Sequence, residues 1–526
     1  AVRTAVGVDV VGSSIVSDGN TQSATAAGNV TVGAGNALSL SASTISANAA
    51  VGSDQSVQGA LTALVGSAGT PAVAGFSVDA TGTSSPSGGL FEFKGTAPAT
   101  LAQYNALVAT YAGNPNYSFG PLVAGTFTVT ISNLVAPING TTPLMSAAQA
   151  AVPGAGGVSI AVGNDIVGST VRMADNASSG DVIGNAARNS LAVNGTTSVS
   201  VTSTASAASV NAVRDAASSA SVANRQAVEG VSTLRSAVAG QYLTSAGDDV
   251  GNGTVAGGAT VLVDGNTLAS SVTGNSASNA SALSGGTLAA TSALSNDQLA
   301  NVGTYTAGIG SDASATVQVG DDVLLSSVTV SGNGTSAAIL ANDAVNSVSA
   351  TATQVINRGD VTNNASSTSG RTVLADYALG NIQSQSASEA ATAYGQFSVQ
   401  GLSGVDAASD QSTLAVSGNS VAASADGNAA RSTIALDAGS VSSNGGINNY
   451  QISGGELDAV TGAAGAPASA QIAYGFANGG SLGVTGNGFT ASSQANLASS
   501  AVNVASDTGI AGDNEPTSLA STAQAN

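Results

Sequence analysis

The chain has 526 residues and a net charge of −20, and it contains no Cys, no His and no Trp. Its only lysine is Lys94, and its ten basic residues are scattered singly. Without His or Cys, the usual groups for acid/base catalysis, thiol chemistry and zinc or copper binding are missing. Without clustered basic residues, nucleic acids and anionic membranes are disfavoured as partners. We therefore expect no enzymatic activity, no essential transition metal, no binding of nucleic acid and no insertion into a membrane.

Composition also predicts that the chain folds. Hydrophobic residues make up 43% and charged residues 8%, whereas disordered chains combine low hydrophobicity with high charge. Aromatic residues are only 3%, and most apolar positions hold Ala or Val, which suit a thin and closely layered interior. No apolar run is long enough to span a bilayer. The chain begins at Ala1 without the segments of a signal peptide, and we expect a mature exported chain whose signal was removed.

The first predicted element is a β-strand over residues 1–11, which opens a first β repeat module at residues 1–60. Side chains alternate strictly along it, with Val and Thr on one face and Arg3 and Asp9 on the other. We see no polar cap at this end, so the strand is suited to pair with another chain. We predict that it contacts a neighbouring subunit through Val2, Val6, Val8 and Val10.

Residues 61–155 differ in composition from the rest and predict an inserted subdomain. They hold eight of the ten prolines and eight of the seventeen aromatic residues. Apolar residues recur with helical spacing between Thr100 and Ala112, so one short helix is expected there. Aromatic residues concentrate at protein interfaces, and we expect contacts between subunits through Phe91, Phe93, Tyr104 and Tyr111. The alternative is that these rings form the subdomain's own small core.

Residues 156–526 predict five further β repeat modules, each marked by two Asn residues nine positions apart. Most of these residues follow Gly, and the alternation of apolar side chains resumes with shifted parity after Gly418-Asn419. Gly and Asn tolerate the left-handed conformation of a tight bend, and a one-residue shift returns the next strand's apolar side chains to the interior. The predicted structural corners are Asn20, Asn29, Asn176, Asn185, Asn266, Asn275, Asn333, Asn342, Asn419, Asn428, Asn487 and Asn496. A weaker downstream repeat places Gln after a polar or aromatic residue, as in Asp54-Gln55 and Arg225-Gln226.

Short strands joined by regular corners predict an all-β fold, a parallel β-solenoid or β-helix rod built from degenerate repeats. Small side chains would fill its narrow core while each coil stacks on the next at strand spacing. The alternative is a string of tandem β-sandwich modules, which have a similar size. We favour the solenoid because sandwich cores usually contain side chains larger than Ala.

An Asp recurs near the start of the modules. This pattern suggests calcium binding as one interpretation, because carboxylate oxygens are the ligands that calcium prefers. The alternative, which we favour, is a turn residue whose carboxylate accepts a hydrogen bond from the backbone. We predict no cofactor, with calcium left open. The candidate ligands are Asp248, Asp249, Asp321 and Asp322.

The Gly-Asn-punctuated, Cys-free repeats rich in Ala, Ser, Val and Thr resemble bacterial repetitive surface adhesins and extracellular matrix-fibre proteins. The resemblance implies secretion to the cell surface and assembly or adhesion, and it identifies no functional residue. We expect a structural subunit of an extracellular fibre or surface layer, such as a biofilm matrix or cell-surface filament, that assembles head-to-tail with copies of itself. The alternative is a monomeric adhesin that binds surface glycans or neighbouring surfaces through the inserted subdomain. A polysaccharide lyase or hydrolase is disfavoured because the five Glu residues are isolated.

Overall fold

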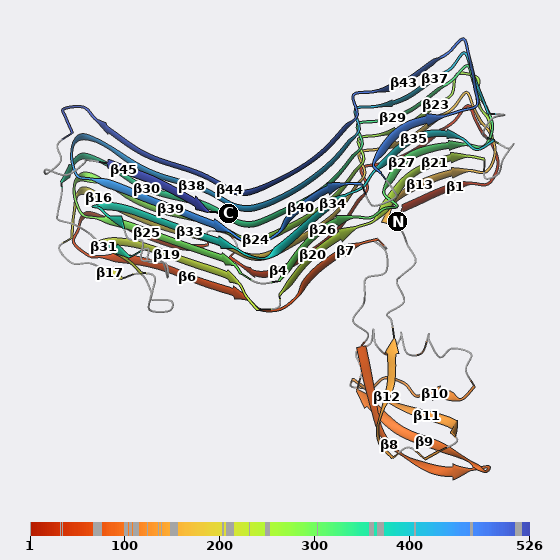
Figure 1. Cartoon of the computed structure of the whole chain (residues 1–526), viewed down its shortest axis with the longest axis horizontal. Helices are drawn as coiled ribbons and strands as arrows, with labels where there is room; N and C mark the ends of the chain where they lie inside the picture. The colour runs from red at the N-terminus through yellow and green to blue at the C-terminus, as the bar shows by residue number, and fades with distance from the viewer. Residues whose placement is uncertain are drawn as a thin grey trace. The chain divides into compact units, whose positions relative to one another are not determined.

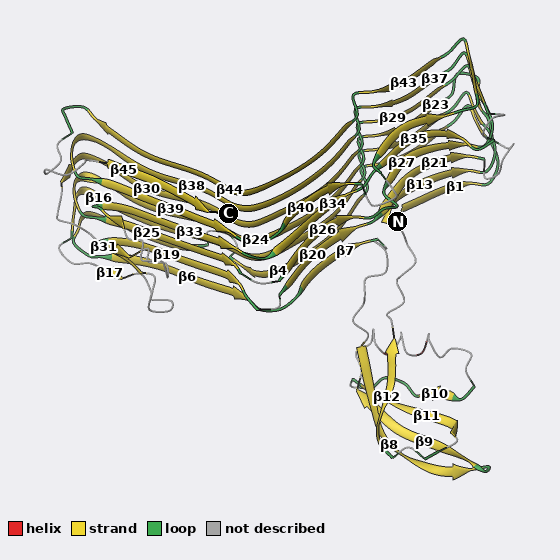
Figure 2. Ribbon diagram, in the orientation of Figure 1, coloured by secondary structure: helices red, strands yellow, loops and turns green. Residues whose placement is uncertain are grey.

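The computed structural model divides the chain into two compact units. The solenoid unit comprises residues 1–68 and 156–526, and the inserted unit comprises residues 69–155. The structure describes residues 2–66, 76–98, 104, 108, 115–147, 156–201, 205–206, 215–247, 253–356, 362–364, 373–403, 407–462, 467–510 and 518–525, with single gaps at 32, 34, 124, 135, 138, 231 and 302. Within this part of the chain, strands joined by short loops dominate (Figure 2).

The solenoid unit is built from six coils, numbered here in chain order, whose strands stack in parallel to form six sheets, numbered in the order in which a coil visits them (Figure 1). Sheet 1 contains β1 (Val2–Val6), β13 (Gly156–Val162), β21 (Gly240–Ala246), β27 (Ser314–Val319), β35 (Gln396–Gly401) and β41 (Ser469–Ala473). Sheet 2 contains β2 (Val10–Val11), β14 (Ile166–Val167), β22 (Val255–Ala256), β28 (Val323–Leu324), β36 (Ala408–Asp410) and β42 (Phe476–Asn478). Sheet 3 contains β3 (Ser14–Asp18), β15 (Thr170–Ala174), β23 (Thr260–Asp264), β29 (Ser327–Ser331), β37 (Thr413–Ser417) and β43 (Ser481–Thr485).

The other three sheets contain the longest strands. Sheet 4 contains β4 (Thr21–Val30) with β5 (Asn36–Ile45), then β16 (Ala177–Ser200), β24 (Thr267–Ala289), β30 (Gly334–Ile356), β38 (Ser420–Ser442) and β44 (Gly488–Ser506). Sheet 5 contains β6 (Ala49–Val57), β19 (Ala220–Val228), β25 (Ser292–Ala300), β33 (Tyr377–Gln385), β39 (Gly445–Ser453) and β45 (Ser518–Ala525). Sheet 6 contains β7 (Leu61–Val65), β20 (Thr233–Val238), β26 (Thr304–Ile309), β34 (Ser388–Ala393) and β40 (Leu457–Thr461), and so ends one coil earlier.

This topology confirms the predicted parallel β-solenoid and excludes tandem sandwiches. In a sandwich, strands pair antiparallel within one module, whereas each strand here pairs in parallel with its equivalent in the next module. The segments that follow sheet 4 form a short antiparallel set of strands. Its strands are β17 (Ala205–Ser206), β18 (Asp215–Ser218), β31 (Thr362–Asn364) and β32 (Val373–Leu374). No helix in the described ranges is long and apolar enough to cross a membrane.

Small aliphatic side chains fill the coils in two separate clusters. The larger cluster joins sheets 1, 3 and 6 to the first half of sheet 4, with fully buried residues such as Val171, Leu234 and Tyr305. The smaller cluster lies between the second half of sheet 4 and the first half of sheet 5, around Leu191 and Val222. A coil is therefore long enough to need two cores, and polar residues lie between them.

The two Asn residues of each pair occupy different positions. The first lies between strands: Asn419 joins β37 to β38, and Gly418 before it has a φ of 65°. Four equivalent glycines have φ between 63° and 66°, and Asp175 takes the same conformation in coil 2. This is the left-handed region that Gly adopts without a steric cost. The Gly-Asn sequence at this position therefore makes a corner between sheets 3 and 4.

The prediction of a corner is wrong for the second Asn of each pair. These residues lie inside continuous strands of sheet 4: Asn29, Asn185, Asn275, Asn342, Asn428 and Asn496. The parity shift is real, because Gly427 and Asn428 are consecutive buried residues in an otherwise alternating strand. A bend within the strand accommodates this shift, and Figure 1 shows the long strands bending near their middle. A Cβ on Gly427 would lie 2.6 Å from the carbonyl oxygen of Ala495, so Gly is required there by the neighbouring coil.

Two predicted boundaries also need correction. Residues 1–11 form two short strands, β1 and β2, because the chain turns into sheet 2 after Val6. Residues 61–65 form β7, which pairs with β20 and belongs to the solenoid unit, so the insertion begins later than residue 61. Of the expected helix between Thr100 and Ala112, the structure describes only Tyr104 and Val108, and both are helical.

The inserted unit is a five-stranded antiparallel sheet in the order β10-β11-β9-β8-β12. Its strands are β8 (Phe76–Ser87), β9 (Leu90–Pro98), β10 (Tyr117–Phe119), β11 (Thr126–Leu134) and β12 (Gly140–Ala147). Phe93 and Phe127 are buried at its centre with small aliphatic residues. Aromatic residues of this unit, among them Phe93 and Phe127, thus supply part of its own core.

Candidate functional site

A ladder of asparagine side chains runs through the corner between sheets 3 and 4. In each step the Nδ2 amide donates to the Oδ1 atom of the equivalent Asn in the next coil, at 2.7–3.0 Å. The backbone N–H of the same residue donates to the same Oδ1 atom. Six residues take part: Asn20, Asn176, Asn266, Asn333, Asn419 and Asn487. The ladder fixes the register of one coil on the next through a repeated bidentate contact.

The second Asn of each pair builds a parallel ladder between the two apolar clusters. Asn185 donates to Asn275 at 2.8 Å, and Asn275 donates in turn to Asn342 at 2.8 Å. Each of these amides also donates across the coil to a carbonyl of sheet 5, such as that of Leu299. Asn185, Asn275 and Asn342 are fully buried. Since buried amides need all their partners, this ladder joins sheets 4 and 5 as well as successive coils.

Three further ladders complete this buried polar layer. Asn189, Asn279 and Asn346 stack in sheet 4, and Asn224, Asn296, Asn381 and Asn449 stack in sheet 5. The two stacks are cross-linked, for example from Asn189 to Asn224 at 3.0 Å. The third ladder consists of Gln55, Gln226, Gln298, Gln383, Gln451 and Gln524. Its Nε2 atoms donate toward the preceding coil, in the direction opposite to that of the corner ladder. The sequence showed the recurrent Gln but not that it stacks.

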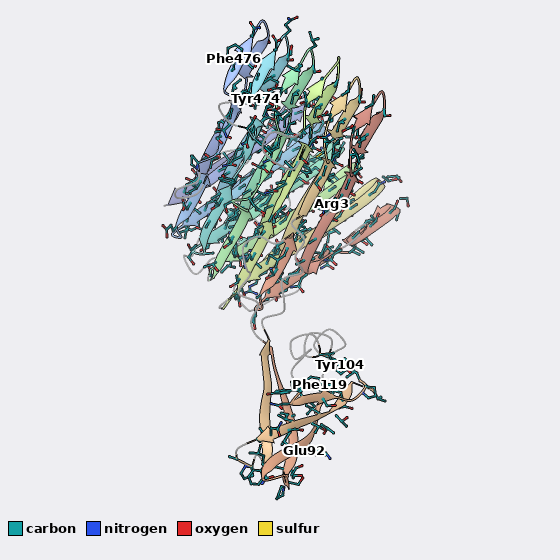
Figure 3. All side chains as sticks on the ribbon, turned by 90° about the vertical axis from the view of Figure 1, so that its right-hand side faces the viewer. Arg3, Glu92, Tyr104, Phe119, Tyr474 and Phe476 are labelled. Carbon is teal, nitrogen blue, oxygen red and sulfur yellow. The ribbon has the colours of Figure 1, made fainter. Side chains whose placement is uncertain are left out.

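The solenoid core is open at the coil 6 end. In sheet 3 one core-facing column contains Val171, Val261, Val328 and Leu414, all 0% exposed. The next residue of the column is Leu482, which is 49% exposed. Val484 and Phe489 continue two other columns and are 47% and 40% exposed. Arg3 and Phe476 mark the two ends of the stack in Figure 3. The terminal coil therefore presents core side chains that no further coil covers in the described structure.

The predicted N-terminal contact residues differ in their surroundings. Val2 and Val6 pack against the core of the solenoid unit, and Val10 is buried. Val8 follows β1 and is 64% exposed. The outer edge of β1 has no neighbouring strand in the described chain, because β1 is the first strand of sheet 1. The strand edge and Val8 are thus open to a neighbour, Val2 and Val6 are partly so, and the contact stays a prediction.

The predicted aromatic contacts of the inserted unit need a correction. Phe93 is fully buried in the core of this unit, so it is not available as a contact. Tyr104 is partly buried, packs edge-on against Phe127 and donates to the Gly120 carbonyl at 3.0 Å. Phe91 is half-buried, and Tyr111 lies outside the described residues. Sequence alone could not distinguish these rings, because a small sheet must bury some of its aromatics to fold.

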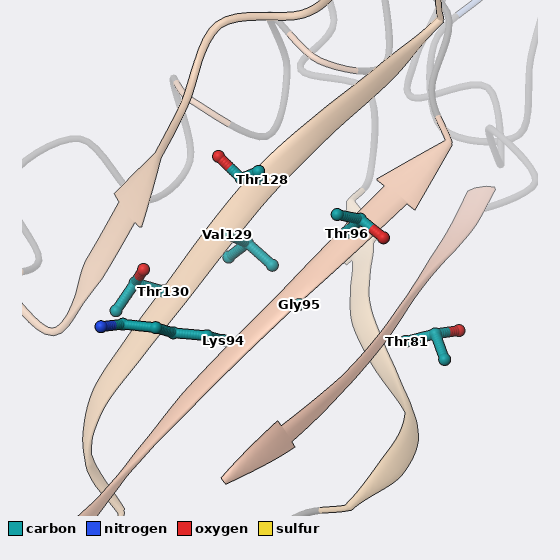
Figure 4. Close-up of a pocket in the computed structure, with 7 residues that line it drawn as sticks. All are labelled: Thr81, Lys94, Gly95, Thr96, Thr128, Val129 and Thr130. Atoms are coloured by element: carbon teal, nitrogen blue, oxygen red, sulfur yellow. The ribbon is translucent and has the colours of Figure 1, made fainter. Parts of the chain in front are cut away.

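A shallow depression of about 500 Å³ lies on the inserted unit (Figure 4). Thr81, Thr96 and Thr128 form one row across three strands, and Lys94 pairs in register with Thr130 beside it. The Lys94 ammonium lies 2.8 Å from a carboxylate oxygen of Glu92, and its hydrogen bond lowers the pKa of that carboxyl. The depression thus combines exposed hydroxyls with the only lysine of the chain.

The candidate calcium ligands have other roles where the structure describes them. Asp322 accepts the backbone N–H of Ala408 at 2.7 Å, and Asp165 accepts that of Thr254 in the same way. Asp321 accepts the Ser403 hydroxyl at 3.1 Å. Asp248 and Asp249 lie outside the described residues. No cluster of three potential metal ligands occurs among the residues that could be searched.

Within the described residues, the carboxyl of Glu389 is buried in the solenoid unit. Glu389 of β34 is fully buried next to Tyr305, its register partner in β26. Neither Glu389 oxygen nor the Tyr305 hydroxyl has a hydrogen-bond partner in the described structure. Gln385 lies nearby and acts to lower the pKa of Glu389, but its amide donates to the Ala387 carbonyl. Burial, with a smaller effect from Asp426, raises the pKa of Glu389 to about 8.

The sequence matches no protein-family model and no curated protein, and the structure matches no solved structure.

Proposed function

We propose that this chain is a non-catalytic structural subunit of an extracellular fibre or surface layer, which assembles head-to-tail with copies of itself. The observation that carries the proposal is the uncovered core at coil 6. Leu482, Val484 and Phe489 continue buried columns and yet remain 40–49% exposed. A further coil in the same register would bury them, and full burial of such a side chain is worth about 1.5–3 kcal/mol.

The sheet edges support the same arrangement. At one end β1 has a single neighbour, β13, and at the other end β41 has a single neighbour, β35. Unpaired edges of parallel sheets readily accept another strand. Contact between two different ends of the same molecule is heterologous, and when its repetition does not close a ring it generates a filament. An extracellular location is supported by the Cys-free, Gly-Asn-punctuated repeats that resemble bacterial surface fibres.

The proposal is tested by placing a charge on the uncovered core. Leu482→Glu is expected to leave the chain folded, because the side chain is half-exposed, and to prevent assembly, because the carboxylate would be buried at the joint. Ser481→Glu is the matched control, since Ser481 is exposed on the same strand, does not face the core and would lie opposite the uncharged Ser14 of the next copy. Light scattering and electron microscopy across a concentration series measure the assembly.

Filaments from the wild type and from Ser481→Glu, but not from Leu482→Glu, are the expected result. A wild type that stays monomeric at every concentration would overturn the proposal. Equal assembly of all three chains would show that the coil 6 end is not the joint.

A second candidate function is a cell-surface adhesin that binds glycans through the inserted unit. The depression around Lys94 favours it, because its hydroxyls and ammonium can hydrogen-bond to sugar hydroxyls. Thr96→Val, which removes one hydroxyl from the row, is expected to weaken binding of the whole chain to a polysaccharide by about fivefold. Thr413→Val is the control, since Thr413 is an exposed threonine of the solenoid unit, away from the depression. Equal binding by both variants, measured by calorimetry, would contradict this function.

A further inference from the structure

The corner ladder repeats one hydrogen-bonding unit at every step between coils. In the interior, the Oδ1 atom of Asn419 accepts both the backbone N–H and the side-chain amide of Asn333, each at 3.0 Å. Asn419 then donates in the same two ways to Asn487, at 3.1 and 2.8 Å. An interior Asn is therefore an acceptor toward the preceding coil and a double donor toward the next one.

The two terminal residues of this ladder each retain one half of the unit. The Oδ1 atom of Asn20 in coil 1 receives no hydrogen bond within the described structure, although its amide donates to Asn176 at 2.7 Å. Asn487 in coil 6 uses its amide once, toward the Val416 carbonyl at 3.0 Å, and its backbone N–H has no acceptor among the described residues. One end of the stack therefore offers an acceptor and the other end offers two donors.

The glutamine ladder gives the same result with the opposite direction of donation. Gln226 donates to Gln55, and Gln524 donates to Gln451, so the donors point toward coil 1. At the coil 1 end, Gln55 donates only to the Ala186 carbonyl, whereas Gln226 also donates to the preceding Gln. At the coil 6 end, the Oε1 atom of Gln524 receives no donor in the described part of the chain. The unused donor of Gln55 and the unused acceptor of Gln524 therefore lie at opposite ends of the stack.

We propose that these ladders form the joint between subunits: Asn487 of one copy donates from its backbone and its amide to Oδ1 of Asn20 in the next copy, while Gln55 of that copy donates to Gln524. The inference rests on the proposed head-to-tail function and assigns its partner, polarity and register. A head-to-head contact would bring the acceptors of two Asn20 residues together, and a tail-to-tail contact would bring the donors of two Asn487 residues together. Only the head-to-tail arrangement satisfies both ladders.

The same register continues the rest of the coil. If Asn487 is followed by Asn20 of the next copy, β41 to β45 lie against β1 to β6, and sheets 1 to 5 continue across the joint. Leu482 then faces Ile15 as Val171 does inside the chain. A second copy of this chain is the occupant that fits, because the hydrogen-bond donors and acceptors left unused at one end match those left unused at the other end. A different protein at this end is an outcome that the experiment distinguishes.

Asn487→Asp tests the joint. The variant keeps the oxygen that accepts from Asn419 but replaces the amide donor by a second acceptor, which would face Asn20 of the next copy. We expect filament elongation to slow by at least about tenfold, because one hydrogen bond of the joint is lost and a carboxylate oxygen then faces the Asn20 Oδ1 atom. Asn503→Asp adds the same charge at an exposed position of the same coil and should elongate like the wild type. Melting curves of the unassembled chains check that both variants fold.

The polarity of filament growth can be tested separately, by finding which end stops growing. Asn487→Asp subunits retain Asn20 and can add to a wild-type filament, but they then block the next addition, so a small fraction of them should arrest growth at one end only. Gln55→Glu removes the donor of the second ladder and should arrest growth at the other end. If Asn487→Asp elongates as fast as Asn503→Asp, the ladder joint is wrong and the proposed function stands. If the wild type forms no filaments alone but does so with another protein, the second copy is the wrong partner and the proposed function fails with it.

Discussion

Replacing Asn275 by Ala is expected to lower the free energy of unfolding by about 3–9 kcal/mol. The side chain is fully buried and makes three hydrogen bonds, to Asn185, Asn342 and the Leu299 carbonyl. Truncation leaves each of these partners unsatisfied in the interior, at about 1–3 kcal/mol apiece. Because the ladder crosses every coil, the loss cannot be relieved by a shift of one side chain. Chemical denaturation followed by circular dichroism measures the effect.

Asn503→Ala provides the control, since Asn503 is exposed in the same sheet. It should change the free energy of unfolding by less than about 0.5 kcal/mol. Equal effects of the two substitutions would mean that the buried ladder adds nothing to stability. A small effect of Asn275→Ala alone would show that water replaces the lost partners.

The sequence pattern predicted the solenoid because its two signals are local. Alternation of small apolar residues indicates strands, and Gly-Asn indicates a change of direction. It could not separate the two kinds of Gly-Asn, because Asn419 and Asn428 have the same local sequence signature. What distinguishes them is long-range: Gly418 takes a left-handed conformation at a free corner, whereas Gly427 passes close to the backbone of the next coil.

The roles of the other site residues also depend on stacking. Gln226 and Asn224 become ladder residues only because equivalent residues lie one coil away, in register across sheet 5. The exposure of Leu482 depends on its place in the last coil, since Leu414 at the equivalent position is buried. A single sequence gives the repeat spacing, but it does not give the register between coils. The open core at coil 6, on which the proposed assembly rests, therefore became visible only with the structure.

Raising the pH from about 5 to about 8 is expected to destabilise the solenoid unit through Glu389. Burial raises the pKa of this carboxyl from 4.5 to about 8, so between these values the folded chain holds a proton that the unfolded chain has lost. The stabilising contribution is complete below pH 4.5 and is lost as the pH rises through 8. The full difference is on the order of 5 kcal/mol. Above this range the Glu389 contribution should be flat.

Glu389→Gln isolates this contribution, because it removes the charge while keeping the shape of the side chain. Asp426 and Asp343 also have raised pKa values, so the wild-type curve contains further slopes. Subtracting the variant's stability curve from the wild-type curve cancels these slopes. This holds as long as the substitution does not change the pKa of Asp426, the carboxylate that acts on Glu389. Glu456→Gln, at an exposed position of the same region, should run parallel to the wild type. Denaturant unfolding at pH 5, 7 and 9 measures all three chains, and a Glu389→Gln curve parallel to the wild type would mean that Glu389 is already ionised at neutral pH in the folded chain.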